Sequence, residues 1–153
     1  MTGLDQAEDA FRNRCASAAR LLAPFAHHFI ARVSFEAQDD EESLEITLRD
    51  GPSKPEAIIS LAGLRHVGLS KGPGLSGCFV DAISVIHLPR TPLPWPEEAA
   101  AFVRRFDGLE ELVWLRLVGP AEIDVVASIV TVYVAMSDDE ASTEPTATDP
   151  TTV

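Results

Sequence analysis

Four histidines are the first side chains in this chain that could act as metal ligands. His27 and His28 are adjacent, so in a strand they point to opposite faces and cannot easily share an ion. His66 and His87 fall on segments expected to be neighbouring strands and could meet, but no Cys or carboxylate stands at a suitable spacing beside them. We therefore expect ordinary strand histidines, with no metal site and no cofactor.

Cysteines and carboxylates could supply a nucleophile or an acid–base pair. Cys78 with His66 or His87 is the one conceivable nucleophile–base pair, but Cys78 begins an apolar strand and has no group nearby to lower its pKa. An inert core thiol is favoured. Asp81 and Asp124 interrupt apolar strands, and they could act as acid and base, face solvent or bond a neighbouring backbone group. We expect a non-enzymatic protein with no catalytic residues.

The segment 68–74 (GLSKGPG) invites comparison with a phosphate-binding loop. It lacks the required spacing of Gly, Lys and Ser or Thr, and no helix is expected after it. A hairpin loop is the favoured interpretation.

Length and composition indicate one domain with a tail. The chain has 153 residues, is 46% hydrophobic and contains 24 acidic against 12 basic residues. Residues 1–136 are expected to form a single domain with its own core, and residues 137–153, rich in Ser, Thr, Pro and acids, an acidic disordered tail.

The net charge of −12 is unevenly distributed. Five acids lie in the tail and four in the run 39–42, which leaves only −3 for the rest of the chain. Binding of nucleic acid is not expected, because phosphate contacts need clustered Lys and Arg. An acidic loop can meet a basic partner, although acidic loops also serve solubility alone.

Cysteine use and hydropathy bear on the compartment. Cys15 and Cys78 lie far apart among apolar neighbours, which favours two free thiols in a reducing compartment, with a single disulfide as the alternative. The N-terminus lacks the basic and apolar regions of a signal peptide, and no apolar run is long enough for a membrane span. We expect a soluble, cytoplasmic protein that does not bind membranes.

The last apolar run, residues 123–136 (IDVVASIVTVYVAM), organises the expected fold. It is rich in β-branched residues and apolar on both faces, so it predicts a central or doubly covered strand, with a bend near Ser128. A helical turn followed by a strand is the alternative.

Two helices are predicted beside the strands. The first spans about Leu4 to Ala23 and ends before Pro24, and its apolar stripe consists of Leu4, Phe11, Cys15, Ala18 and Leu22. The second begins at Pro96 and ends before Gly108, and its stripe consists of Ala99, Phe102, Val103 and Phe106.

Period-two alternation predicts strands at 27–37 and 44–48, separated by a polar loop at 38–42. Further strands are expected at 78–88, which is apolar on both faces, and at 112–118, with one or two short strands in 57–69 broken near Gly63. The resulting fold class is α+β: a curved, mostly antiparallel sheet of about six or seven strands with an N-terminal helix and one late helix packed on it.

The candidate binding residues are the acidic run Asp39, Asp40, Glu41 and Glu42 together with Trp95. If Trp95 and the connector 90–96 lie at the surface beside the acidic run, they form an apolar anchor with an acidic rim, a usual layout for protein recognition. The alternative is that Trp95 and Trp114 are core aromatics.

Residues 45–50 (EITLRD) and 56–88 (EAIISLAGLRHVGLSKGPGLSGCFVDAISVIHL) resemble small β-rich bacterial immunity proteins of polymorphic toxin systems in the texture of their strands. The resemblance implies a non-enzymatic cytoplasmic protein that binds and blocks a cognate toxin. It transfers no binding residue.

The preferred function is therefore a protein-binding module, an immunity-type inhibitor whose acidic run meets a basic protein partner. A small-molecule-binding β domain is the alternative, and it would need a roomy apolar cavity between the sheet and the first helix. A self-associating structural subunit is the third class, and it would use an exposed strand edge.

Overall fold

The computed structural model describes residues 3–50, 56–70 and 77–135. The elements, in chain order, are α1 (Gly3–Leu22), the short 3-10 helix η1 (Ala23–Phe25), β1 (Phe29–Gln38), β2 (Glu41–Arg49), β3 (Glu56–Leu69), β4 (Ala82–Leu88), the 3-10 helix η3 (Glu97–Ala101), β5 (Leu112–Val118) and β6 (Ile123–Ala135). The predicted tail at 137–153, the end of the predicted domain at residue 136 and positions 71–76 of the glycine-containing loop lie outside the described residues.

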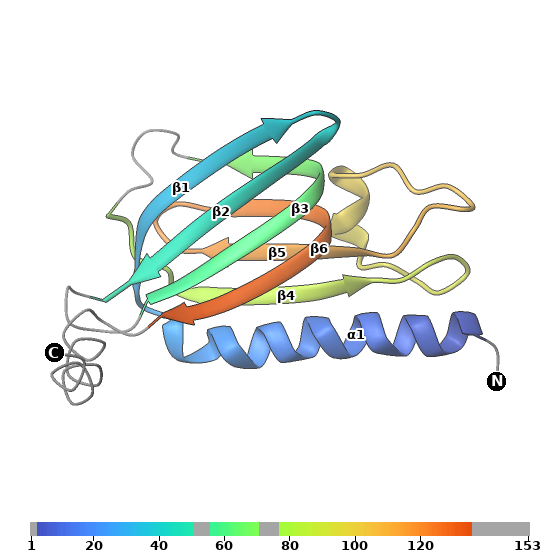
Figure 1. The fold of residues 1–153 in the computed structure, drawn as a ribbon, viewed down its shortest axis with the longest axis horizontal. Helices are drawn as coiled ribbons and strands as arrows, with labels where there is room; N and C mark the ends of the chain where they lie inside the picture. Colours follow the sequence, from blue (N-terminus) through green and yellow to red (C-terminus); the bar gives the residue numbers. More distant parts are fainter. Residues whose placement is uncertain (1–2, 51–55, 71–76, 136–153) are drawn as a thin grey trace, which may run out of the picture.

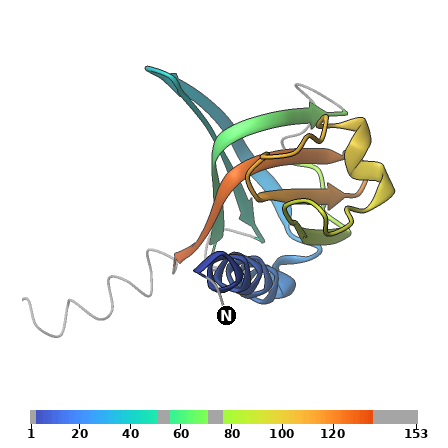
Figure 2. The same ribbon diagram turned by 90° about the vertical axis from the view of Figure 1, so that its right-hand side faces the viewer.

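The strands form one antiparallel sheet in the order β1-β2-β3-β6-β5-β4. The sheet curves strongly, and the β1–β2 hairpin projects away from the rest of it (Figures 1 and 2). The predicted antiparallel α+β fold with an N-terminal helix is confirmed. The last strand, β6, lies between β3 and β5, as its β-branched, apolar sequence indicates.

Backbone hydrogen bonds link the two ends of this sheet. Residues 77–80, which precede β4, pair with residues 27–30 around the start of β1, for example from the Val80 N–H to the His28 carbonyl at 2.9 Å and from the Ile30 N–H to the Cys78 carbonyl at 2.9 Å. The predicted strand at 78–88 is therefore divided between this pairing and β4. Beyond Ile30, β1 has no described strand on its outer side.

For residues 123–136, the sequence left open a helical turn followed by a strand. The structure excludes this alternative over the described part, because β6 is one strand from Ile123 to Ala135. Its partner β3 is also a single strand, so the predicted break near Gly63 is wrong. Instead the register shifts between Leu64 and His66, and Gly63 adopts φ +67° where a Cβ would lie 2.8 Å from the Ser128 hydroxyl. Only glycine both adopts this φ easily and leaves room for the Ser128 side chain. The chain therefore forms a β-bulge here, and the pairing of β3 with β6 continues on both sides of it.

The main core lies between α1 and the concave side of the sheet. The predicted stripe of the first helix is confirmed at Cys15, Ala18 and Leu22, which are buried, and at Phe11, which packs against the same cluster. Opposite lie fully buried side chains such as Ile46 on β2, each worth about 1.5–3 kcal/mol on burial. Within the described residues, no helix combines the length and apolar character needed to cross a membrane.

The predicted late helix is wrong: residues 97–101 form only the 3-10 helix η3, and the chain then turns. A helix of the predicted length is marginal without tertiary support. Here tertiary contacts favour another path, because the Arg105 guanidinium donates hydrogen bonds to the carbonyls of Pro89 and Leu93 and lies over the Trp95 ring. Phe106, predicted to be buried, is 58% exposed.

A second apolar cluster covers the outer face of the sheet beneath this segment. Phe102 and Val103 pack against the buried Trp114 and Leu112 of β5 and against Val126 of β6. The segment that contains η3, drawn in gold, lies on the opposite side of these strands from α1 (Figure 2). The middle of the sheet is therefore covered on both faces, whereas the β1–β2 hairpin is covered on neither near its tip.

Candidate functional site

The acidic run lies at the end of the β1–β2 hairpin. The strands pair up to Gln38 and Glu41, so the connection is a two-residue turn, Asp39–Asp40. Asp39 adopts φ +55°, a left-handed conformation that Asp tolerates and that two-residue hairpin turns require. The strands continue into the segment 38–42 that the sequence predicted as a loop, and this rigid ladder fixes the spacing of the acids.

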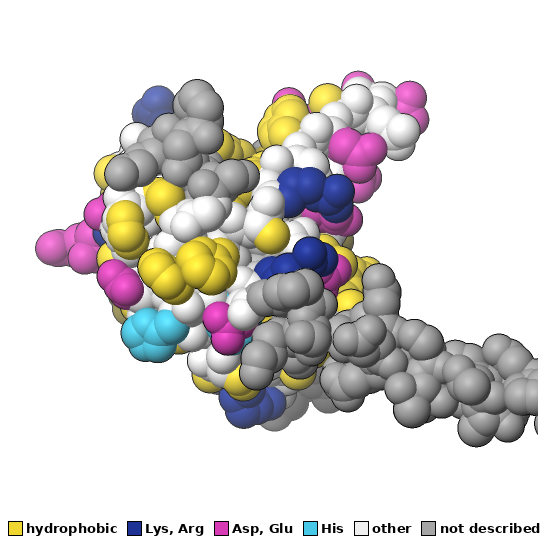
Figure 3. Space-filling view, turned by 90° about the vertical axis from the view of Figure 1, so that its left-hand side faces the viewer, with side chains coloured by type: hydrophobic (Ala, Val, Ile, Leu, Met, Phe, Trp, Pro, Cys, Tyr) yellow, Lys and Arg dark blue, Asp and Glu magenta, His cyan; other side chains and the backbone are white. Residues whose placement is uncertain are grey.

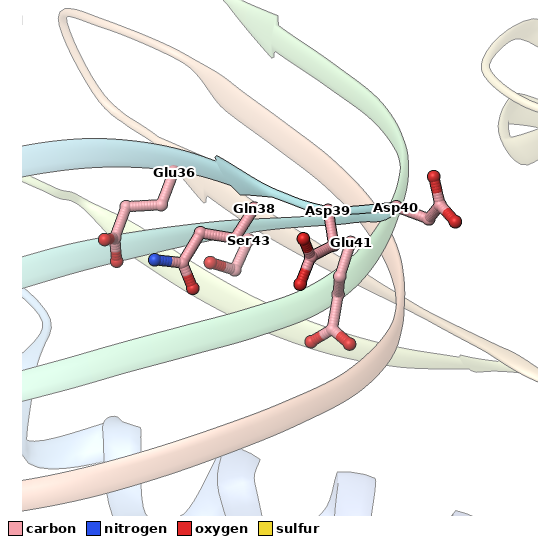
Figure 4. A pocket seen from close by; sticks show the side chains of 6 residues that line it. All are labelled: Glu36, Gln38, Asp39, Asp40, Glu41 and Ser43. Atoms are coloured by element: carbon pink, nitrogen blue, oxygen red, sulfur yellow. The ribbon is translucent and has the colours of Figure 1, made fainter.

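One face of the hairpin end is hollowed. Six side chains line a hollow of about 440 Å³: Glu36, Gln38, Asp39, Asp40, Glu41 and Ser43. Cross-strand pairing of Glu36 with Ser43 and of Gln38 with Glu41 places these four side chains on one face of the ribbon. Figure 4 shows the Asp39 and Glu41 carboxylates pointing to the same side as Gln38, while Asp40 points away. The hollow therefore presents several oxygen acceptors to one incoming group.

The acids of the hairpin end are exposed and carry no compensating charge. Asp39, Asp40, Glu41 and Glu42 form no ion pair with any cation in the described part of the chain. Figure 3 shows acidic side chains gathered at the end of the projecting hairpin. Because the carboxylates that line the hollow repel one another, a cation entering it would gain from each of them. Glu42 does not line the hollow, because it pairs with Ala37 and lies on the other face of the ribbon.

Trp95 does not join this site. Its indole N–H donates to the Pro89 carbonyl at 2.7 Å, its ring lies 4.8 Å from the Arg105 guanidinium carbon, and it packs against the outer cluster. The hairpin end and η3, which follows Trp95 closely, lie on different sides of the molecule (Figure 2). Trp95 holds the connector onto the sheet, and the composite anchor predicted from the sequence does not form.

The histidines have separate partners. His66 stacks on Phe102 on the outer face at 4.7 Å between ring centroids, whereas the His87 Nε2 atom lies 2.7 Å from Glu111 and its ring packs near Phe11 of α1. The expectation that His66 and His87 lie on neighbouring strands is wrong, because β6 and β5 separate their strands. The two side chains also face opposite sides of the sheet, so they do not meet. His28 packs edge-on against Phe25.

The two candidate acid–base residues, Asp81 and Asp124, have separate surroundings. Asp124 accepts the Trp114 indole N–H at 2.9 Å and lies 3.7 Å from Arg116, so it closes a structural network. The side chain of Asp81 is exposed, and its backbone N–H donates to Val118. Among the residues the structure describes, no group of three or more His, Cys, Asp or Glu side chains could hold a metal ion.

Cys15 and Cys78 do not form a disulfide with each other; Cys15 is buried and Cys78 is half-buried. Burial raises the pKa of the Cys15 thiol from 9.0 to about 11, with nearby Glu111 acting in the same direction and Arg14 opposing it. Such a thiol is a poor nucleophile, because the thiolate is the reactive species.

We expect Cys15 to resist alkylation at pH 8 in the folded protein. A pKa near 11 instead of 9.0 leaves about a hundred-fold less thiolate, and burial further restricts access. The measurement is the rate of iodoacetamide labelling of a Cys78→Ser variant, compared with the same variant in denaturant. Equal rates in the two conditions would contradict this account.

The interface between α1 and the sheet bears on ligand binding. Its buried side is filled by Cys15, Leu22 and Ile46, among others. On its outer side, a groove of about 340 Å³ lies between residues 13–21 of α1 and residues 130–132 of β6, lined by polar Asn13, Arg14 and Ser17 as well as apolar side chains. This groove lies at the surface and differs from the roomy apolar interior that a small-molecule-binding domain was expected to show.

Sequence reasoning missed three residues of the hollow: Glu36, Gln38 and Ser43. The signal was present, because Glu36 and Gln38 alternate with Phe35 and Ala37, and such alternation continuing up to two turn residues is typical of a tight hairpin. Reading 38–42 as a loop concealed which side chains share a face.

Comparison with protein-family models and with curated sequences found no relative of this chain. The resemblance of residues 45–50 and 56–88 to immunity proteins therefore stays a prediction from strand texture. The residues of the hairpin end have to be interpreted from their own geometry and charge.

Proposed function

We propose that this chain is a non-enzymatic protein-binding module that captures a basic protein at the end of the β1–β2 hairpin. The observation that supports it is the hollow at the hairpin end, where Asp39 and Glu41 point to one side and no described cation neutralises them. A Lys or Arg side chain of the partner enters this hollow, and Gln38 and Ser43 supply further acceptors.

Charge also governs how the partner arrives. The hairpin end projects from a body that is nearly balanced in charge, so it is a localised negative field that steers a basic protein toward one place (Figure 3). Such steering speeds association and weakens as salt rises. The role that best fits is that of a cytoplasmic immunity-type inhibitor, which must find and block a cognate toxin quickly.

Neutralising the acidic run is expected to weaken binding of this partner by about ten-fold or more, since exposed charge pairs contribute roughly 0.2–1 kcal/mol each. The variant is D39N/D40N/E41Q/E42Q, in which the asparagine at the first turn position still tolerates the left-handed conformation. The tagged full chain is used for capture from its host at low and high salt, and the captured protein is purified and its affinity and activity measured.

The matched control neutralises four exposed acids away from the hairpin: Asp81, Glu97, Glu98 and Asp107. It should bind like the native chain. A partner that binds the hairpin variant as well as it binds the native chain, or that binds independently of salt, would refute the proposed site. A partner whose activity is unaffected by binding would refute the inhibitor role.

A further inference from the structure

A second hollow lies at the base of the β1–β2 hairpin. Its volume is about 320 Å³, and residues of β1, β2 and β3 line it: Ala31, Arg32, Thr47, Arg49, Glu56 and Ile58. Cross-strand pairing of Arg32 with Thr47 and of Thr47 with Ile58 places these three side chains on one face of the sheet. No residue lines both this hollow and the acidic one at the hairpin end, so the two hollows are separate.

A β-bulge brings Arg32 to this face. Ile30 pairs with Leu48, and both side chains are buried in the core. Strict alternation would place Arg32 on the same inner face as Ile30. Ala31 is an extra residue, however, so Arg32 pairs with Thr47 on the outer face. Bulges often re-aim a side chain beside a functional site, and this one aims an arginine into the hollow.

Arg32 is an uncompensated cation in this hollow. Its neighbour Arg49 is held by Glu56, to which the Arg49 Nε atom donates at 2.9 Å. Arg32 is exposed, and within the described residues it forms no ion pair, hydrogen bond or cation–π contact. A guanidinium carries five N–H donors in a planar fork that fits a carboxylate. The described part of the chain leaves this donor set unused.

Thr47 supplies a second unused donor. It is only 6% exposed, yet its hydroxyl forms no hydrogen bond within the described residues. Among these residues, only the Nε atoms of Arg90 and Arg116 are sealed from solvent without a partner, so the Thr47 oxygen is accessible from the hollow that Thr47 lines. A valine of similar shape would avoid the cost of burying a hydroxyl. The hydroxyl is therefore placed for an acceptor that comes from outside.

We propose that this hollow receives the carboxylate of an Asp or Glu side chain of the same basic partner, an inference that rests on the proposed function. Arg32 and Thr47 donate to its oxygens while a Lys or Arg of the partner occupies the hairpin end. Both hollows lie on one face of the ribbon, since Arg32 and Glu36 are four residues apart on β1, about 13 Å at 3.3 Å per residue. Basic side chains lie between the acidic hairpin end and the body (Figure 3). The partner therefore carries an acid about 13 Å from its base.

This contact gives the hairpin specificity that negative charge alone does not give. Arg32 weakens the attraction of the hairpin end for a basic protein unless it meets an acid of that protein. Basic proteins without an acid at this spacing are then rejected by like charge. The two accounts predict opposite effects of removing Arg32. Long-range attraction alone predicts tighter binding, because the chain becomes more negative, whereas the proposed contact predicts weaker binding.

The variant R32Q is expected to weaken binding of the captured partner by about ten-fold, since it removes charge-assisted hydrogen bonds to the carboxylate. T47V should weaken binding by about three-fold. It should also keep the urea unfolding midpoint at least as high as that of the native chain, because the hydroxyl has no partner in the fold. Isothermal titration calorimetry of the full chain at one salt concentration gives the affinities. Among variants of the partner's own acids, one should cost little further affinity once Arg32 is replaced.

The matched control is R104Q, which removes an exposed arginine outside the hairpin and should bind at least as tightly as the native chain. If R32Q binds as tightly as the native chain or more tightly, the inference is overturned, while weaker binding of the variant with a neutralised acidic run still supports the proposed function. If the partner binds independently of the acidic run, or if the full chain captures no basic protein, the proposed function fails and this inference fails with it.

Discussion

Replacing Trp114 with alanine is expected to lower the free energy of unfolding by about 3–5 kcal/mol, the usual loss for a large aromatic in a core. Trp114 is 1% exposed and lies at the centre of the outer cluster. Its ring meets Phe102 edge-on at 5.3 Å, and its indole N–H donates to Asp124 at 2.9 Å. The truncation therefore leaves a cavity and a half-buried carboxylate that has lost one donor.

Two further variants separate these contributions. Trp114→Phe keeps most of the ring but removes the donor to Asp124, so it should cost about 1–2 kcal/mol. Trp95→Ala removes the other tryptophan, which is only half-buried, and should cost less than Trp114→Ala. Urea unfolding followed by circular dichroism gives all three values. Losses of the same size for both tryptophans would show that the outer cluster does not depend on Trp114.

Strands whose pattern reflects local burial could be predicted from the sequence. The run 123–136 is apolar on both faces because β6 is central and covered twice near Val126. The stripe of α1 likewise follows from its packing against one surface. In α1 the buried positions Cys15, Ala18 and Leu22 follow the period of the helix. The predicted inward face of β1 is wrong: Ile30 is buried while Ala31, Phe35 and Ala37 are exposed, because the register shifts between Ile30 and Arg32 and the hairpin then leaves the body.

The failures arose where distant contacts decide the outcome. The alanine-rich segment after Pro96 has helical signals, but Arg105 and Trp95 bind the connector and redirect the chain. His66 and His87 were expected on neighbouring strands, because sequence alone does not show that β6 and β5 lie between them. Neither the strand order nor the path of the connector is a local property.

The candidate site could likewise be predicted only in part. The acids at 39–42 and their lack of nearby basic residues are visible in the sequence, but their shared hollow depends on the register of β1 against β2. A shift of one residue would move Glu36 and Gln38 to the other face. The two-residue turn at Asp39–Asp40 sets this register.

Replacing His87 with alanine is expected to lower the free energy of unfolding by about 3 kcal/mol, because it leaves the Glu111 carboxylate without its partner in the core. The side chains of His87 and Glu111 are only 12% and 7% exposed, and the Nε2 and Oε1 atoms lie 2.7 Å apart. The loss of ring contact with Phe11 of α1 adds to the cost.

The companion variant H87L/E111L tests whether the loss comes from the unpaired carboxylate. Apolar side chains at both positions remove the need for a partner, so the double variant should be more stable than His87→Ala and close to the native chain. The pair lies between α1 and the start of β5, where leucines have apolar neighbours in Phe11 and Cys15. A double variant as unstable as His87→Ala, measured by urea unfolding, would mean that packing against α1 rather than the hydrogen bond accounts for the loss.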